Sequence, residues 1–434
     1  MKKHHSLRRW FWLAAAIPIA WLIGLLLLWG VYSLPNERPL YHAQQSAHVF
    51  WQEDTHRSWI EGGLPNVQVD NIADACIIGM AANDLDVGYT PLQRALNSYF
   101  PLVPGENWAS CTHVAMYLSN PDQTYDAFYY GRYWGGFALM ARLWLHLFTF
   151  PQIRTINLVI QILVALATCI LVWRELGWRG GIAVIAAYVA LSPYTISLSM
   201  QYYPCFYLGF GGMACVAWFH RRKMGVHAYE WLFLILGILT AYLDFLTYPA
   251  AVVGLPLVIW LALNMRSEKL FLTMLRLGIL WCVGYAGMWA GKWLMCAVAG
   301  MSFTGGTVGE KLSTYTGEVG DSLLQLILIP FRSISKKRLL LLALPCLAGA
   351  GWCLHKLRQG LAVWNKRAGY YLLLMLVPLA WIVFSKGHSA YHDFLCNRNL
   401  TVFFSAAFLM CSSLVTVKAS DEKHLTNSKG RLLC

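Results

Sequence analysis

Long apolar runs separated by short polar turns dominate the pattern of this chain. A helix of about 20 apolar residues is long enough to cross a bilayer. The pattern predicts ten such spans, at residues 11–34, 153–173, 180–197, 204–219, 230–247, 249–264, 270–298, 338–354, 369–385 and 399–417. We therefore expect an all-α fold class, a polytopic membrane protein with about ten transmembrane helices.

The stretch after the first span breaks this pattern. Residues 35–131 are polar and are interrupted by prolines and glycines, which predicts short helices and loops outside the bilayer, with the clearest helix at 72–82. Residues 132–150 are nearly long enough to cross, but they contain two arginines and a histidine. We expect an interfacial helix there. An ordinary span, with some turns inverted, is the alternative.

These patterns divide the chain into four parts. Residues 1–34 hold a tail and the first span, 35–152 the large outer loop with its interfacial helices, 153–417 the helix bundle, and 418–434 a polar cytoplasmic tail. Segment 321–337 is too short to cross, and we expect it to lie along the outer surface.

Charge adds an orientation to this picture. The chain has 34 Lys and Arg against 21 Asp and Glu, a formal net charge of +13. The cations gather in short turns at 174–179, 221–223, 266–269 and 356–367. Basic turns stay in the cytoplasm, so we expect both termini and these turns inside and the large loop outside. Cations scattered in this way form no nucleic-acid groove, and no nucleic acid is expected as a partner.

Composition supports a membrane protein. The chain is 58% hydrophobic and only 13% charged, whereas soluble domains carry about 25% charged residues. Twelve cysteines include no closely spaced pair of the zinc-binding kind. Cys76 and Cys111 both fall in the outer loop, where a disulfide or two free buried thiols are the alternatives.

Two acids in the outer loop are the candidate catalytic residues. Asp70 and Asp74 are four positions apart, so on a helix they share one face. A carboxylate can take a proton from an attacking hydroxyl. We expect Asp74 to matter most, because it opens a helix-like apolar run, with Asp70 second. The alternative is that both are solvated and one caps the following helix.

Candidate substrate-binding cations lie in the bundle. Lys292 sits inside a predicted span, where a charge faces the bundle interior or snorkels to the interface. Lys386, His388, His392 and Arg398 share one outer turn, suited to a phosphate or pyrophosphate or to outer lipid headgroups. His388 and His392 lack a third ligand at suitable spacing, so no metal or other cofactor is predicted.

The other candidates are one acid and three aromatic residues. Asp244 stands at the outer end of a predicted span, where it binds substrate hydroxyls or forms a structural ion pair. Tyr133, Trp134 and Tyr202 offer flat faces that stack on sugars or flank a prenyl chain. They would serve equally well in an aromatic interface belt.

Four sequence stretches carry a resemblance to a known family. They are GRYWGG at 131–136, FPQIRTINLVIQ at 150–161, WRELGWRGG at 173–181 and ALSPYTISLSMQYYP at 190–204. Their order resembles the GT-C superfamily of polyprenyl-phosphate-sugar-dependent glycosyltransferases, which includes protein O-mannosyltransferases and bacterial aminoarabinose transferases. The adjacent acid pair usual in that family is absent here.

The resemblance implies a bacterial inner-membrane enzyme whose active site faces the periplasm or exterior. It would move a sugar, with inversion, from a polyprenyl-phosphate donor to a glycan, lipid or protein acceptor, with membrane lipid around it. One alternative is a transporter or flippase of lipid-linked sugars or polysaccharide, without catalysis. Another is a polysaccharide polymerase or ligase, which would carry its large loop later in the chain.

Overall fold

The computed structural model describes residues 2–53, 55–58, 67–106, 110–301, 324–325, 328 and 336–417. Within them, seven helices are long and apolar enough to cross a membrane: Leu7–Tyr32, Phe150–Ala190, Val226–Leu243, Leu270–Val298, Leu339–Arg358, Lys366–Phe384 and Phe394–Ser412. The expectation of a mostly helical chain with several possible spans is confirmed. The expected total of about ten spans is not shown.

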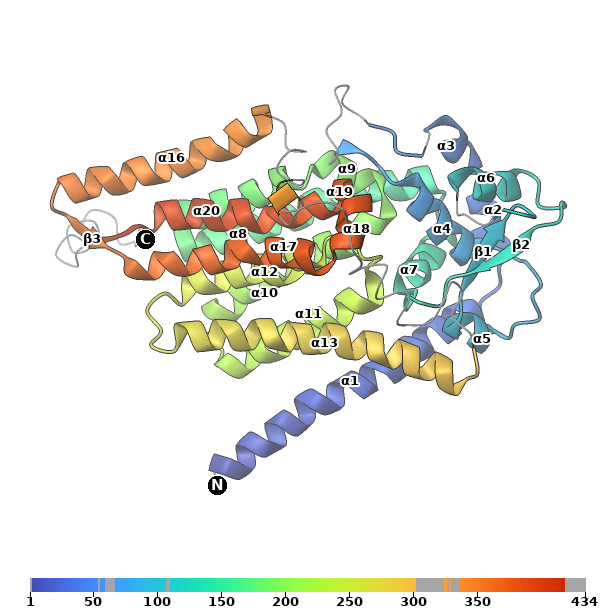
Figure 1. Ribbon diagram of the computed structural model, residues 1–434, viewed down its shortest axis with the longest axis horizontal. Coiled ribbons are helices and arrows are strands. Elements are labelled where there is room, and N and C mark those ends of the chain that lie inside the picture. Colours follow the sequence, from blue (N-terminus) through green and yellow to red (C-terminus); the bar gives the residue numbers. More distant parts are fainter. Residues whose placement is uncertain are drawn as a thin grey trace.

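The long helices form one bundle. They are α1 (Lys2–Tyr32), α8 (Phe150–Ala190), α10 (Tyr203–Arg221), α11 (Val226–Leu243), α12 (Pro249–Leu263), α13 (Leu270–Val298), α16 (Lys336–Arg358), α17 (Tyr370–Phe384) and α20 (Thr401–Ser412). They run along the length of the molecule, with the outer loop at one end (Figure 1). Helix α12 is buried from Pro249 to Leu261 and contacts α8, α10, α11, α13, α17 and α20. A helix that is apolar all round belongs in such a centre.

Helix α8 accounts for two of the expected spans, 153–173 and 180–197. Its 41 residues are interrupted at Gly177, which has φ 64° and ψ −157°, a conformation open mainly to glycine. The chain folds back at Gly177. A hydrogen bond between the two arms shows this, since the Gln161 side chain donates to the Tyr188 hydroxyl at 3.2 Å. In one straight helix these residues would lie about 40 Å apart. The second arm ends at Ala190, earlier than expected.

The outer loop is a small packed unit. It contains α2 (Glu37–Gln44), α3 (Ala47–Gln52), α4 (Asn71–Ala82), α5 (Pro91–Leu96), α6 (Cys111–Ser119), α7 (Gly136–Leu145), β1 (Tyr99–Leu102) and β2 (Asp126–Tyr129). The predicted helix at 72–82 is confirmed as α4. Every residue of α4 except Ile72 is buried, so it forms the core of this unit.

The all-α expectation needs a correction. Strands β1 and β2 pair antiparallel in the outer unit, and β3 (Ala362–Trp364) pairs with β4 (Val415–Val417) at the other end. The remaining short elements connect the helices: α9 (Pro193–Leu198), η2 (Met200–Tyr202), η3 (Lys366–Gly369), α18 (Lys386–Tyr391), α19 (Asp393–Cys396) and η4 (Asn397–Leu400). Two-stranded ribbons of this length need the neighbouring helices for stability.

Helix α7 decides between the two readings of 132–150. Its 10 residues span about 15 Å, half of a bilayer core, so it is not an ordinary crossing. Arg142 fixes it from inside, donating to the carbonyl oxygens of Val31 at 3.0 Å, Leu34 at 2.8 Å and Ala81 at 2.6 Å. Burial lowers the pKa of the Arg142 guanidinium to about 10. Through its hydrogen bonds to these carbonyl oxygens, Arg142 joins the ends of α1 and α4 to α7.

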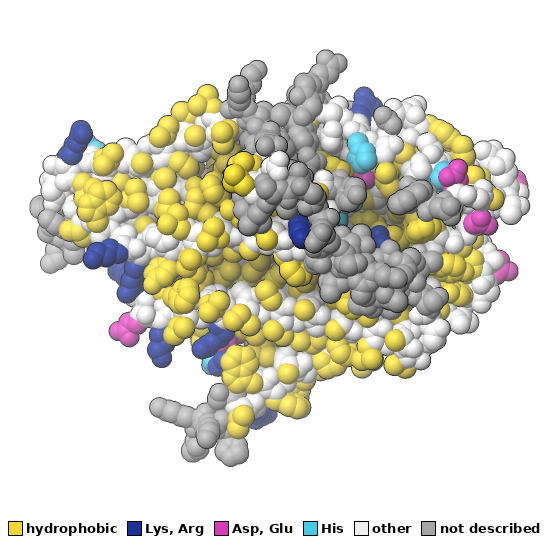
Figure 2. All heavy atoms as spheres, viewed as in Figure 1, with side chains coloured by type: hydrophobic (Ala, Val, Ile, Leu, Met, Phe, Trp, Pro, Cys, Tyr) yellow, Lys and Arg dark blue, Asp and Glu magenta, His cyan; other side chains and the backbone are white. Residues whose placement is uncertain are grey.

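The basic turns gather at the opposite end of the bundle, with the chain's beginning. Arg9 donates to the buried Glu230 at 2.8 Å, and Arg276 reaches the same carboxyl at 3.2 Å. Arg367 donates to the backbone of Met265 and Ser267. Figure 2 shows most acidic side chains around the outer unit and most basic ones at the far end. The basic turns and the outer unit therefore lie at opposite ends of the bundle, and which end faces the cytoplasm stays a prediction.

Three further expectations concern a disulfide in the outer loop, the segment 321–337 and the C-terminal tail. Cys76 and Cys111 are both free and buried, so the disulfide is not formed. The segment 321–337 and the tail 418–434 lie outside the described residues, apart from a few positions of the former.

Candidate functional site

Asp74 lies in a buried polar cluster between α4 and the loop that leads into α10. Its side chain has no exposed surface, and its Oδ1 accepts from the backbone amide of Gln201 at 3.1 Å. Burial raises the pKa of the Asp74 carboxyl to about 7, although Arg154, Ser199 and Gln201 act to lower it. Near neutral pH the carboxyl is therefore divided between its protonated and ionised forms.

Arg154, from the start of α8, closes one side of this cluster. It is 6% exposed and donates to the Glu53 carboxylate at 2.6 Å and to the Asn71 side chain at 3.3 Å. Its guanidinium also lies over the Phe150 ring, 4.2 Å from the centroid. The ion pair joins the start of α8 to the end of α3, and the hydrogen bond to Asn71 joins it to α4. A charge inside an apolar run marks Arg154 in the sequence, although the sequence analysis assigns it no role.

Asp70 is the N-cap of α4, as one alternative predicted, but both acids are buried and the solvated acids of that alternative are not found. Its Oδ1 accepts from the Ala73 amide at 3.1 Å, and the Nε2 of His56 lies 3.9 Å from the same oxygen. The Asp70 side chain is 8% exposed and that of His56 is 39% exposed. Of the two acids, only Asp70 therefore reaches the surface, and it does so beside a histidine that the sequence analysis missed.

Arg398 and Tyr202 meet next to this pair. The Arg398 guanidinium lies 3.9 Å from the centre of the Tyr202 ring, and both side chains are buried. Arg398 donates to the carbonyl of Gln68 at 3.4 Å, and the Tyr202 hydroxyl reaches the same oxygen at 3.4 Å. The structure thus brings the 386–398 turn, the Tyr202 loop and the segment before Asp70 together.

The two histidines of that turn differ from the expectation. His388 bonds to the carbonyl of Leu246 at 2.9 Å through Nε2, and its ring centre lies 4.7 Å from that of His392. Burial, with a smaller contribution from His392 beside it, lowers the pKa of His388 to about 3. His388 is therefore neutral, and it adds no charge to a phosphate site. Lys386 begins α18 and is half-buried.

Lys292 and Trp134 lie in a different place. The Lys292 ammonium donates to the backbone carbonyls of Leu96 at 2.6 Å and Ala95 at 3.2 Å, at the end of α5. Trp134 is 5.7 Å from the ammonium, and its indole donates to the Met288 carbonyl at 2.6 Å. These residues anchor the outer unit to α13. Neither contacts the acid cluster in the described structure.

Asp244 has a local partner. It caps the end of α11, where its carboxylate accepts from the Thr247 hydroxyl at 2.5 Å and from the Thr247 amide at 3.0 Å. The expected ion pair is not formed with any cation in the described part of the chain. Asp244 shapes the turn that presents Leu246.

Tyr133 belongs to a stack of aromatic rings at the outer end of the bundle. Its ring lies parallel to those of Phe245, at 5.1 Å, and Tyr130, at 5.3 Å, and edge-on to Trp289, also at 5.3 Å. The Arg132 guanidinium lies over two of these rings, 4.3 Å from the centre of Tyr130 and 5.2 Å from the centre of Tyr133. Arg132 is half-buried, and it is close enough to His388 to lower that residue's pKa.

A groove of about 600 Å³ runs between α12, α13 and α17 and ends below this aromatic stack. Its walls are almost wholly apolar, including Leu246, Val253, Trp281, Tyr285, Trp289 and Trp381. Along α13 the lining runs from Gly278 to Trp293, about 22 Å by helical rise. The indole of Trp293 donates to the Arg132 carbonyl at 3.3 Å. The groove is therefore apolar along its length, and the backbone of Arg132 lies beside its outer end.

Within the described residues, no group of three or more metal-ligating side chains is present. Comparison of the chain with protein family models, with curated proteins and with solved structures finds no match.

Proposed function

We propose that this protein is a membrane glycosyltransferase that moves a sugar from a polyprenyl-phosphate carrier to an acceptor on the outer face of the membrane. The proposal includes ten crossings, with each arm of α8 crossing once and α10 and α12 crossing despite their modest length or hydropathy. It also places the basic turns in the cytoplasm and the outer unit outside.

The observation that carries the proposal is the contact between the apolar groove and the acid-bearing unit. Leu246 lines the groove, and its carbonyl oxygen bonds to His388. From there the rings of His392, Phe394 and His56 follow at centre distances of 4.7, 6.0 and 5.0 Å, and His56 lies beside Asp70. A lipid chain in the groove would bring its polar head to this end.

Each part of the site has a chemical task in this scheme. The groove holds the polyprenyl chain, since an apolar chain is stabilised by leaving water or by replacing bilayer lipid. Arg132 stands at the groove's outer end and is the cation for the donor phosphate. The buried Arg398 holds the Tyr202 loop against Gln68 and so positions the acids.

Asp70 is the general base in this proposal. The acceptor oxygen attacks the anomeric carbon, a new carbon–oxygen bond forms, and the bond from that carbon to the phosphate oxygen breaks. The proton of the acceptor hydroxyl passes to the Asp70 carboxylate, and the polyprenyl phosphate leaves with the bond's electron pair. A base must reach the acceptor, so accessibility favours Asp70 over the fully buried Asp74.

The test is turnover by the purified full-length protein. The protein is reconstituted in vesicles with a panel of polyprenyl-phosphate-linked sugars, and mass spectrometry follows release of the sugar from its carrier. We expect release from at least one donor by the wild type and a large loss in Asp70→Asn. Movement of intact donor across the vesicle membrane, without any cleavage, would support the transporter and reject the proposal.

A further inference from the structure

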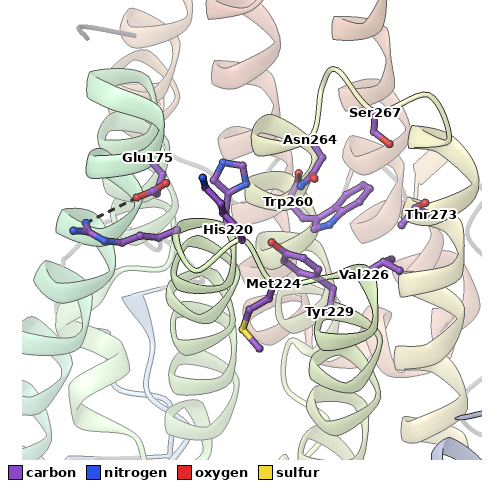
Figure 3. Close-up of a pocket in the computed structure, with 11 residues that line it drawn as sticks. Glu175, His220, Met224, Val226, Tyr229, Trp260, Asn264, Ser267 and Thr273 are labelled. Carbon is purple, nitrogen blue, oxygen red and sulfur yellow. Dashed lines mark hydrogen bonds and ion pairs between the residues drawn. The ribbon is translucent and has the colours of Figure 1, made fainter. Parts of the chain in front are cut away.

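A second pocket lies at the opposite end of the bundle from the acid cluster. It has a volume of about 530 Å³ and opens between the ends of α8, α10, α11, α12 and α13 (Figure 3). Glu175, His220, Arg221 and Lys223 lie on the side formed by the α8 break and the end of α10. The proposed transfer reaction uses none of these residues.

The floor of this pocket is aromatic and buried. Trp260 of α12 is 3% exposed and Tyr229 of α11 is 5% exposed. In Figure 3 both rings lie in the same hollow as His220 and Asn264. Apart from Met224 and Val226, the rest of the lining is polar, with Ser267 before α13 and Thr273 in its first turns. Cations and small hydroxyl or amide donors therefore surround one cavity.

Arg221 and Lys223 line the pocket from a turn with an unusual backbone conformation. Lys223 has φ 53°, the left-handed region that a helix end usually gives to glycine. The Lys223 amide donates to the His220 carbonyl, and the Met224 amide to the Phe219 carbonyl, both at 2.9 Å. These bonds satisfy the carbonyls at the end of α10, whose partial negative charge would oppose an anion.

One acid faces these cations. Glu175 lies 4.0 Å from Arg221, a long distance for an ion pair, and the Arg221 side chain is 54% exposed. Such a pair contributes little to stability because water screens it. The two cations Arg221 and Lys223 against one carboxylate leave the pocket with an excess of positive charge. It also lies where the bundle helices end, which is the level of lipid headgroups.

We infer that this pocket binds a phosphate-bearing anion, with Arg221 and Lys223 as the cations and Ser267 and Thr273 as hydroxyl donors. Basic pockets between membrane helices commonly hold the headgroups of anionic lipids. The volume suits a headgroup or a small free phosphate compound, since ligand pockets range from about 300 to 1,000 Å³. The inference is independent of the proposed sugar transfer.

The experiment uses the full-length protein in a neutral detergent and native mass spectrometry as the measure of binding. The probes are short-chain phosphatidylglycerol, the zwitterionic phosphatidylcholine and inorganic pyrophosphate. We expect phosphatidylglycerol to bind more tightly than phosphatidylcholine. Competition by pyrophosphate would show that the phosphate group suffices, and its absence would identify the lipid headgroup as the ligand.

Three variants assign the binding to this pocket. Arg221→Gln with Lys223→Gln should weaken phosphatidylglycerol binding by roughly tenfold or more, as expected for lost charge-assisted hydrogen bonds. Arg222→Gln with Arg266→Gln removes the same charge from positions that do not line the pocket and should change binding little. Glu175→Gln should tighten binding, because it removes the opposing carboxylate.

Two results would overturn the inference. One is equal binding of the two lipids together with no binding of pyrophosphate. The other is an equal loss of affinity in the two double variants, which would assign the effect to overall charge. The Glu175→Gln variant keeps the test decisive if the first double variant folds poorly, since its predicted effect is a gain.

Discussion

The carboxyl oxygen Oδ1 of Asp74 accepts a hydrogen bond from the backbone amide of Gln201, 3.1 Å away and 127 positions later in the chain. Both residues are buried, with exposures of 0% and 1%. Through this contact the central helix of the outer unit is tied to the loop that enters the bundle. The same carboxyl carries a raised pKa, which makes its effect on stability measurable.

The free energy of unfolding should fall as pH rises between the pKa that Asp74 has in the unfolded protein and the pKa that it has in the folded protein. The carboxyl titrates near 3.8 when unfolded, whereas burial raises its pKa to about 7 in the folded protein. Between these values the folded state holds a proton that the unfolded state has lost, so rising pH favours unfolding, by up to about 1.4 kcal/mol per pH unit. Thermal unfolding of wild type and Asp74→Asn at pH 5 and 7.5 measures this.

The asparagine variant cannot titrate, so its melting temperature relative to wild type should increase between those two pH values. Asp122→Asn, at an exposed position, is the matched control and should follow the wild type. Parallel pH profiles for wild type and Asp74→Asn would show that Asp74 does not titrate in this range.

Asp70→Asn should lower the rate of sugar transfer by about a hundredfold to ten-thousandfold, the usual loss of a general base. Asparagine caps a helix as well as aspartate does, so α4 should keep its stability. The measurements are the rate constant of the reconstituted protein and its melting temperature. If Asp70→Asn stays fully active while Asp74→Asn is inactive, the base has been assigned to the wrong acid.

Arg132→Gln should weaken binding of the donor, because it removes the cation beside the groove's outer end. The loss of one charge-assisted contact predicts an increase in the donor KM of roughly tenfold. The acceptor KM should change much less, and this split distinguishes a donor contact from a general defect. Lys386→Gln provides the comparison at the same end of the bundle. An equal increase in both KM values for Arg132→Gln would count against the role.

Arg142→Leu should destabilise the protein by about 3 kcal/mol or more, since several buried carbonyl oxygens lose their donor at once. Arg142→Lys should be intermediate, because an ammonium is a point donor and cannot match the fork of a guanidinium. Thermal unfolding in detergent is the measurement. Arg38→Gln, at an exposed site, should stay near the wild-type value. A wild-type melting temperature in Arg142→Leu would contradict the proposed anchoring.

The orientation of the bundle can be tested with single cysteines and a membrane-impermeant thiol reagent. Gln123→Cys, in the outer unit, should react in intact cells, and Gly225→Cys, in a basic turn, should react only after the membrane is opened. Both positions tolerate the change: Gln123 is exposed, and a side chain at Gly225 meets no atom within 4 Å. Reaction of Gly225→Cys alone in intact cells would invert the topology.

Much of the helical layout could be read from the sequence. Apolar runs of the right length located the long helices because burial in lipid or in the bundle demands them locally. The break at Gly177 was also local, since glycine alone tolerates that conformation and the flanking arginines marked a turn. Proline and glycine spacing likewise separated the outer loop from the bundle. The short ribbons escaped detection because paired strands of three or four residues depend on distant partners.

The roles of single side chains depended on tertiary contacts. The spacing of Asp70 and Asp74 was visible, but only folding made one a partly accessible cap and the other a buried acid. The sequence predicted a substrate cation at Lys292. In the fold, its ammonium instead donates to a carbonyl at the end of α5, about 200 positions earlier in the chain. His388 lost its charge for the same reason, because neighbours from other elements removed water from it. Sequence alone determined which segments leave water, whereas packing between distant segments decided what each polar group would meet there.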